Sequence, residues 1–288
     1  YETSPASVVE AIARHEQVHP VRTLSDMRSR LGNGRRCLGF FHPSLPEKPL
    51  VFVHVALMPD LTGSMLEIRG SPPLLPEADA RAAIFYSINA TNPGLAGVDL
   101  GNALIKRAAS LLAAEFPELE TFSTLSPVPG FRSWLEVKAA SPPPFALSDS
   151  ELFGPHLAPF LSLLPSPPPA SALSSLLSYL SPSPADRLSS PAAPPVLRPL
   201  LLRLLARYLC LERRRNRPVD GVAKFHLGNG AALRRLNWMA DPSGRGMGQS
   251  YGMMVNYEYG GEGEVDGNRG RFGRGEVVRS EEVERHLE

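Results

Sequence analysis

The stretch that decides the fold runs from residue 83 to residue 126 and reads AIFYSINATNPGLAGVDLGNALIKRAASLLAAEFPELETFSTLS. Its first residues, Ala83–Ile88, form an apolar run that predicts a strand. The loop that follows contains two glycines and leads into apolar residues at helical spacing: Leu100, Leu104, Ala108, Leu111 and Leu112. A second strand is predicted at Thr121–Ser126. The order strand, loop, helix, strand predicts an α/β domain.

The flanking segments extend this pattern on both sides. Leu50–Leu57 is apolar on both faces, which predicts a central strand. Val196–Arg213 has the spacing of an amphipathic helix. Gly221–Leu227 and Met253–Tyr259 are predicted to be strands.

Composition excludes several classes of protein. Lys plus Arg (30) almost equals Asp plus Glu (29), so we expect neither a nucleic-acid partner nor a membrane surface. The most apolar stretch, Val196–Leu211, is interrupted by three arginines and cannot span a membrane. Cys37 and Cys210 lack metal-ligand spacing and are typical thiols of a reducing compartment, so no metal is expected.

Proline divides the chain. Half of its 30 prolines lie between residues 141 and 200, in runs that favour extended backbone. We predict one catalytic domain over residues 1–260, in which residues 141–195 are a partly disordered insertion with short helices around 148–164 and 171–180. Residues 261–288 are Gly-rich and charged, and are predicted to be a flexible tail.

The loop before the central helix is a candidate phosphate site. A helix N-terminus presents free backbone N–H groups and partial positive charge, which suits a diphosphate. Gly94 and Gly97 would let the backbone approach phosphate, and Asp99 could cap the first turn. The pattern alone is also typical of an ordinary tight turn.

A candidate catalytic serine lies at the end of the second strand. Ser126 is followed by Pro127 and Pro129, which would hold its hydroxyl in place. A serine needs a partner for acid–base work, and the candidate is His226, which precedes a GNG turn and titrates near neutral pH. His54 lies inside a predicted strand and is expected to be a buried, hydrogen-bonded core histidine.

Six blocks of sequence together resemble the malonyl-CoA decarboxylase family: HPVRTLSDMRSRLGNGRRC, KPLVFVHVAL, AIFYSINATNPGLAGVDLGNALIKR, TFSTLSPVPGFRSWL, VAKFHLGNGAALRRLNWMAD and GMMVNY. They occur in family order over about residues 9–260. The resemblance implies the family's catalytic domain, an α/β, GNAT-like acyltransferase fold with a central mixed sheet flanked by helices and, here, a Pro-rich insertion. The family's helical N-terminal domain has no counterpart, and a chain that begins with Tyr1 is expected to be a fragment.

The resemblance also implies the site residues. Ser126 and His226 would be the catalytic pair, and the CoA phosphates would contact the loop–helix segment Ala96, Gly97, Val98, Asp99, Leu100, Gly101 and Asn102. GNAT loops usually carry Gln or Arg where Thr91 stands here, which removes a side-chain contact and leaves the backbone cradle. Ser126 is preferred to Ser123 because it abuts the proline turn.

The implied function is decarboxylation of malonyl-CoA to acetyl-CoA and CO2 without any cofactor. Full-length family members form homo-oligomers, so the whole protein is expected to be one. Three alternatives stay open: acyl transfer from CoA to an amine, an acyl-CoA sensor without turnover, and a site in which His226 works with Tyr257 instead of Ser126. The compartment also stays open between cytoplasm, mitochondrion and peroxisome.

Overall fold

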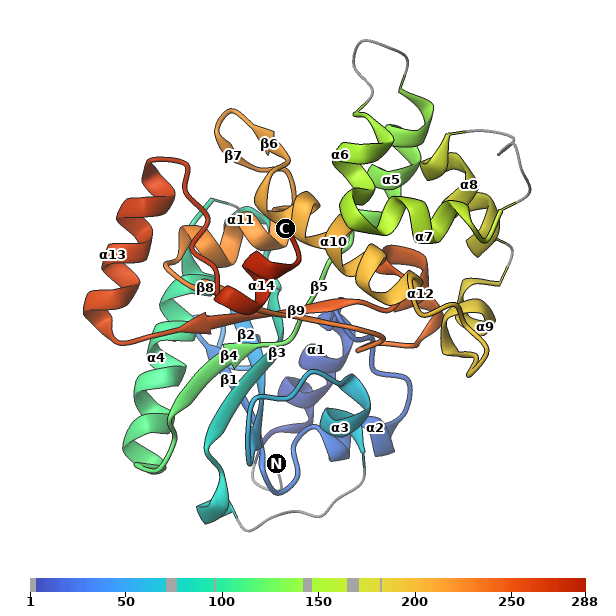
Figure 1. The fold of residues 1–288 in the computed structure, drawn as a ribbon. Coiled ribbons are helices and arrows are strands. Elements are labelled where there is room, and N and C mark those ends of the chain that lie inside the picture. Colours follow the sequence, from blue (N-terminus) through green and yellow to red (C-terminus); the bar gives the residue numbers. More distant parts are fainter. Residues whose placement is uncertain (1–3, 71–76, 96, 142–146, 165–170, 182) are drawn as a thin grey trace. The chain divides into compact units, whose positions relative to one another are not determined.

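The computed structural model describes residues 4–70, 77–95, 97–141, 147–164, 171–181 and 183–288 (Figure 1). Contacts divide the chain into two compact units. The first comprises Tyr1–Ser126 and Glu258–Gly261, and the second comprises Pro127–Tyr257 and Glu262–Glu288. The extent of the catalytic domain, residues 1–260, stays a prediction.

The first unit is built on a mixed sheet. Strands β1 (Arg35–Phe40), β2 (Val51–Met58) and β3 (Ala82–Ala90) are antiparallel neighbours, and β4 (Thr121–Thr124) pairs with β3 in parallel. The last residues of β9 (Met254–Tyr259) pair with β4 in antiparallel register. The predicted α/β class with a mixed sheet is confirmed.

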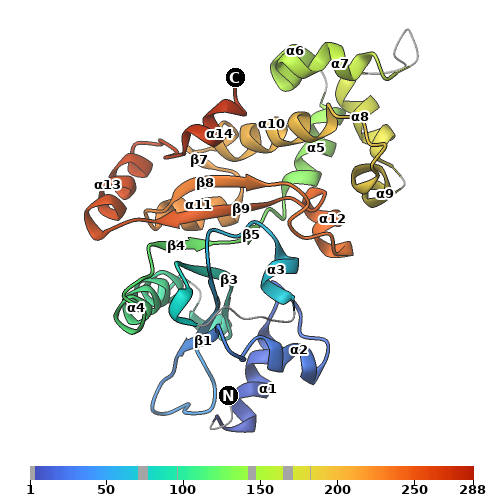
Figure 2. The same ribbon diagram turned by 60° about the horizontal axis from the view of Figure 1, so that its bottom comes forward.

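Helices cover both faces of this sheet. On one face, α4 (Leu100–Glu115) packs its Leu104, Ala108 and Leu112 against alternate residues of β2: Val51, Val53 and Val55. On the other face lie α1 (Ala6–His15) and α2 (Leu24–Ser29), as Figure 2 shows. Since side chains alternate along a strand, β2 has to be apolar on both faces to be covered twice. The remaining short helices of the unit are α3 (Met65–Arg69), η1 (Glu77–Asp79) and η2 (Pro93–Leu95).

A register shift divides β3 into two halves. His54 pairs with Ser87 and Val55 pairs with Phe85, so Tyr86 has no partner on β2 and forms a bulge. The parallel pairing with β4 covers only Ala82–Phe85, and the Leu125 N–H donates to the Phe85 carbonyl (3.1 Å) at its end. Beyond this point β3 continues to Ala90 paired with β2.

A buried carboxylate anchors the second half of β3. Glu16 follows α1, and its Oε1 accepts from the backbone N–H groups of Val18 and His19 (2.8 Å each). Its Oε2 accepts from Ser87 Oγ (2.6 Å) and Asn89 Nδ2 (3.0 Å). Four donors therefore hold an otherwise costly buried carboxylate, and through it the chain after α1 is tied to β3.

His54 lies beside this carboxylate in the core. Its side chain is fully buried, as predicted, and its Nε2 is 3.6 Å from Glu16 Oε2, too long for a hydrogen bond. Among the described residues neither ring nitrogen has a hydrogen-bond partner, which differs from the expectation of a hydrogen-bonded histidine. Burial lowers the pKa of His54 to about 3, so the imidazole is neutral.

The second unit is mainly helical. Its longest helix, α10 (Leu197–Cys210), packs against α5 (Phe131–Ala140), α6 (Asp149–Phe153) and β8 (Ala232–Asn237). β8 pairs with β9. The other elements are β5 (Ser126–Pro127, shared with the first unit), η3 (Gly154–His156), α7 (Leu157–Leu161), α8 (Ala172–Leu180), α9 (Pro184–Ser189), β6 (Arg213–Arg214), β7 (Arg217–Pro218), α11 (Gly221–Gly228), α12 (Gly244–Ser250), α13 (Glu262–Gly273) and α14 (Glu281–Arg285).

Two segments differ from the sequence-based expectation. Gly221–Leu227 was predicted to be a strand but forms α11, because the Asp220 side chain accepts from the first backbone N–H groups and starts a helix. The predicted flexible tail contains α13 and α14, which bury Val265, Phe272 and Val283. Where the structure describes the insertion 141–195, its regular elements are helices.

Replacing Glu16 with Gln should destabilise the protein by about 1–3 kcal/mol, because an amide nitrogen facing Ser87 Oγ and Asn89 Nδ2 leaves buried donors without an acceptor. Urea unfolding of the two proteins measures the difference. Glu10→Gln, on the exposed face of α1, is the matched control and should change the free energy of unfolding by less than about 0.5 kcal/mol. Equal effects of the two substitutions would contradict the anchoring role of Glu16.

Candidate functional site

The loop–helix segment predicted to bind phosphate lies at the start of α4. Gly97 is exposed and has φ +91°, a conformation that favours glycine. Asp99 occupies the N-cap position, but its side chain caps no backbone N–H of the helix. Instead Asp99 Oδ2 accepts from Asn102 Nδ2 (3.0 Å). The first turn of α4 is therefore not capped by Asp99, which corrects the expectation that it could be.

The remaining predicted residues of this segment differ in exposure. Val98 is exposed, Leu100 and Gly101 are half-buried, and Asn102 is buried. Ala96 lies outside the described residues. An exposed glycine turn followed by an uncapped 16-residue helix can offer backbone N–H groups to an anion.

Ser126 closes the first unit. It is 6% exposed and its Oγ donates to Thr124 Oγ1 (2.8 Å). The proline turn follows directly, and the chain then enters α5 at Phe131. Thr124 lies two residues before Ser126, so the two hydroxyls share one face of the strand. That spacing is the sequence signal that could have predicted this contact, which the sequence analysis did not name.

His226 lies in the last turn of α11 in the second unit. Its side chain is buried, with the residue only 4% exposed, and its ring stacks on Tyr257 of β9 with centroids 4.8 Å apart and planes inclined by 21°. Phe225 approaches edge-on at 5.0 Å. Burial lowers the pKa of His226 to about 3, so the imidazole is neutral at physiological pH. The expectation that this histidine titrates near neutrality is wrong for this reason.

The structure therefore brings His226 together with Tyr257, the hydroxyl residue that the sequence left as an alternative partner. Ser126 belongs to the first unit, next to Thr124. Each group of residues is buried in its own unit. The first unit therefore holds a buried pair of hydroxyls, Ser126 and Thr124, and the second unit holds a buried imidazole stacked on a phenol ring, His226 on Tyr257.

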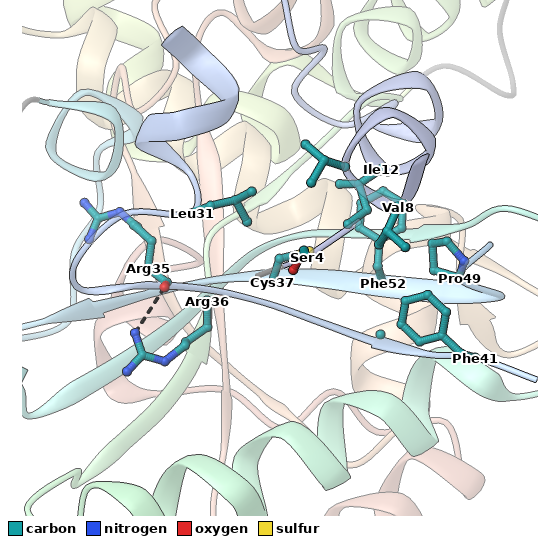
Figure 3. A pocket seen from close by; sticks show the side chains of 12 residues that line it. Ser4, Val8, Ile12, Leu31, Arg35, Arg36, Cys37, Phe41, Pro49 and Phe52 are labelled. Atoms are coloured by element: carbon teal, nitrogen blue, oxygen red, sulfur yellow. Dashed lines mark hydrogen bonds between the residues drawn. The ribbon is translucent and has the colours of Figure 1, made fainter. Parts of the chain in front are cut away.

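A cavity of about 260 Å³ lies elsewhere, between α1 and the strands β1 and β2 (Figure 3). Its walls are mostly apolar, with Val8, Ile12 and Phe52 among them. The two arginines at its rim are already engaged. Arg36 pairs with two carboxylates, and Arg35 donates to two backbone carbonyls. This cavity therefore lacks the free positive charge that a diphosphate requires.

Among the described residues, no three or more His, Cys, Asp or Glu side chains gather in a way that could hold a metal ion. No described helix combines the length and apolar character needed to cross a membrane.

Comparison with known proteins covers the whole chain. Residues 1–288 match the family model described as "Malonyl-CoA decarboxylase C-terminal domain". The chain belongs to this family. It is 39% identical over 283 residues to "Malonyl-CoA decarboxylase, mitochondrial" of Anser anser anser, covering 97% of this chain and 55% of the relative. The protein of the same name from Rattus norvegicus is 41% identical over 259 residues, covering 89% and 51%.

Solved structures of the family agree with the fold. The crystal structure of malonyl-CoA decarboxylase from Agrobacterium vitis superposes with a TM-score of 0.82 at 36% identity, over 99% of this chain and 65% of that one. The corresponding structure from Rhodopseudomonas palustris gives 0.82 at 38% identity, over 98% and 64%. The chain therefore shares the fold of the solved malonyl-CoA decarboxylases. The chain spans about half the length of the curated relatives it matches.

The buried neutral state of His226 has a consequence for stability. Below pH 6.5 the unfolded chain protonates this histidine, whereas the folded chain does not until about pH 3. His226 therefore lowers the free energy of unfolding by up to about 1.4 kcal/mol for each pH unit that the pH falls in this window. The contribution of neutral His226 to the free energy of unfolding is fully present above pH 6.5, the pKa of the histidine in the unfolded chain, and is lost as the pH falls towards 3.

We expect His226→Gln to remove this contribution, so that the difference in unfolding free energy between pH 7 and pH 5.5 becomes smaller than in the wild type. Urea titrations at the two pH values measure it. His42→Gln changes an exposed histidine and should keep the wild-type pH dependence. Identical pH dependence in His226→Gln and wild type would contradict the burial of an uncharged imidazole.

Proposed function

We propose that this chain binds malonyl-CoA and catalyses its decarboxylation to acetyl-CoA and CO2. The observation that carries the proposal is the match of all 288 residues to the family model. The names of relatives that are 39% and 41% identical support it. The structure adds a strand whose pairing with β4 ends at Phe85, a helix N-terminus beyond it, and buried hydroxyl and imidazole groups.

The proposed CoA site combines the second half of β3 with the start of α4. Because the β4 pairing ends at Phe85, the edge of β3 beyond it can pair with the extended amide chain of pantetheine. The same strand runs into the loop that contains Gly97 and then into α4, whose first backbone N–H groups would donate hydrogen bonds to the phosphates. Ligands of α/β proteins commonly bind at such strand ends.

The proposed reaction needs few groups. The bond between the carboxylate carbon and the α-carbon breaks, CO2 leaves, and the electron pair is delocalised into a thioester enolate. A proton from solvent finally occupies the position of the lost carboxylate. Since His226 is neutral, it serves as an N–H donor to the developing enolate oxygen, a role worth about 10²–10³ in rate. Ser126 would hydrogen-bond the carboxylate or position the proton.

Incubating the purified chain with malonyl-CoA should yield acetyl-CoA and CO2 in equal amounts. His226→Ala and Ser126→Ala should each lower kcat by about 10²–10⁴ with little change in KM, because the phosphates are held elsewhere. His42→Ala is the control and should keep wild-type kcat. Product that forms only with an added amine would indicate acyl transfer, and binding without turnover would indicate a sensor. A fully active Ser126→Ala protein would assign the catalytic hydroxyl to another residue, with Tyr257 first.

Gly97→Val tests the phosphate site. Valine is strained at φ +91° and would turn the loop backbone away from the start of α4, so the Kd for CoA should rise about tenfold or more. Gly263→Val is a matched control, because a side chain there meets nothing within 4 Å and φ is not positive. Isothermal titration with CoA measures both. Unchanged affinity of a folded Gly97→Val protein would place the phosphates elsewhere.

A further inference from the structure

Three residues of the second unit, two of them buried, lie together at the start of α11. Gly130 is the last residue of the turn 127–130, which follows Ser126, and is the N-cap of α5. Tyr208 lies on α10, and Asp220 is the N-cap of α11, the helix that carries His226. Tyr208 is 4% exposed and Asp220 is 2% exposed.

Asp220 uses both carboxylate oxygens. Oδ1 accepts from the backbone N–H groups of Val222 (3.0 Å) and Ala223 (2.8 Å), which caps the helix. Oδ2 accepts from the Tyr208 hydroxyl (3.2 Å). A cap needs only one oxygen, so the second hydrogen bond adds a link between the start of α11 and α10.

The Tyr208 hydroxyl also lies against Gly130, at the end of the turn 127–130. A methyl group at position 130 would lie 2.4 Å from the Tyr208 hydroxyl oxygen, closer than real contacts, so either the turn or the buried Tyr208 side chain would have to shift. The Tyr208 ring also packs against Phe131 and Trp134 of α5, with centroids 5.8 and 5.3 Å apart. One side chain therefore sets the position of the turn and of the start of α11.

We propose that Tyr208 and Asp220 form a positioning pair that fixes α11, and with it His226, against the turn that follows Ser126. This inference rests on the proposed function. Neither residue is expected to touch substrate. An eight-residue helix cannot hold its own position in water, so its placement depends on the cap and on packing. An error of about 1 Å in a reacting group can cost about 10²-fold in rate.

Steric complementation between two positions provides the test. Gly130→Ala drives a methyl group into the Tyr208 hydroxyl and should lower kcat by about 30-fold or more with KM nearly unchanged. Tyr208→Phe removes the hydroxyl and should lower kcat by about three- to tenfold. In the double variant the nearest ring carbon lies 3.5 Å from the new methyl group, an ordinary contact. The double variant should therefore recover the kcat of Tyr208→Phe alone.

Gly248→Ala is the matched control, because a methyl group there meets nothing within 4 Å, and it should keep wild-type kcat. Losses that multiply in the double variant, or a lower Tm with unchanged kcat in Gly130→Ala and Tyr208→Phe, would overturn the proposal. If Gly130→Ala does not fold, Tyr208→Phe and Asp220→Asn decide, and wild-type kcat in both overturns it.

A second readout separates this inference from the proposed function. The ring resonances of His226 in an NMR spectrum report its surroundings without any turnover. They should shift in Gly130→Ala and return towards those of Tyr208→Phe in the double variant. A wild-type chain that does not decarboxylate malonyl-CoA would refute the function, whereas unshifted His226 resonances in Gly130→Ala would refute the positioning pair.

Discussion

The parallel pairing of β3 with β4 lasts for only four residues, from Ala82 to Phe85, and the arrangement of the candidate site depends on where it stops. The bulge at Tyr86 shifts the register of β3 on β2 at this same point, so the strand continues along β2 without β4 beside it. One strand then leads into the loop and α4, and the other leads into Ser126 and the proline turn. A pairing that continued for two more residues would cover the strand edge that the proposed ligand requires.

Where β3 and β4 separate, polar groups inside the protein need hydrogen-bond partners other than a neighbouring strand. Each unit contains a buried carboxylate that accepts such hydrogen bonds. Glu16 holds Ser87 and Asn89 of β3 in the first unit. Asp220 holds the start of α11 in the second unit. Both accept three or more hydrogen bonds, which offsets the cost of removing them from water. Burial still raises the pKa of Asp220, because desolvation outweighs its hydrogen bonds.

Local patterns predicted the elements whose signals are local. Leu50–Leu57 and the helix after Gly97 were identified correctly, because apolar periodicity along the chain reflects the faces they bury. Gly221–Leu227 was misassigned, since a short apolar run suits a strand or a helix and only the Asp220 cap distinguishes them. The role of Glu16 could not be predicted, because its partner Ser87 lies 71 residues away. Local pattern and resemblance together suggested Ser126 and His226 as candidates, but not the charge state of the histidine, which tertiary burial determines.

That charge state bears on which reaction suits the site. Acyl transfer to an amine requires a base that removes a proton from the attacking nitrogen, and a base is efficient when its pKa lies near the working pH. An imidazole whose pKa burial has lowered to about 3 is a poor base. Decarboxylation produces an enolate, which needs a hydrogen-bond donor that is already oriented and does not change its protonation state. In the proposed reaction, the neutral N–H of His226, held by stacking on Tyr257 and by a capped helix, would meet that requirement. Under the proposed function, the burial that keeps His226 neutral therefore suits the role of hydrogen-bond donor better than that of general base.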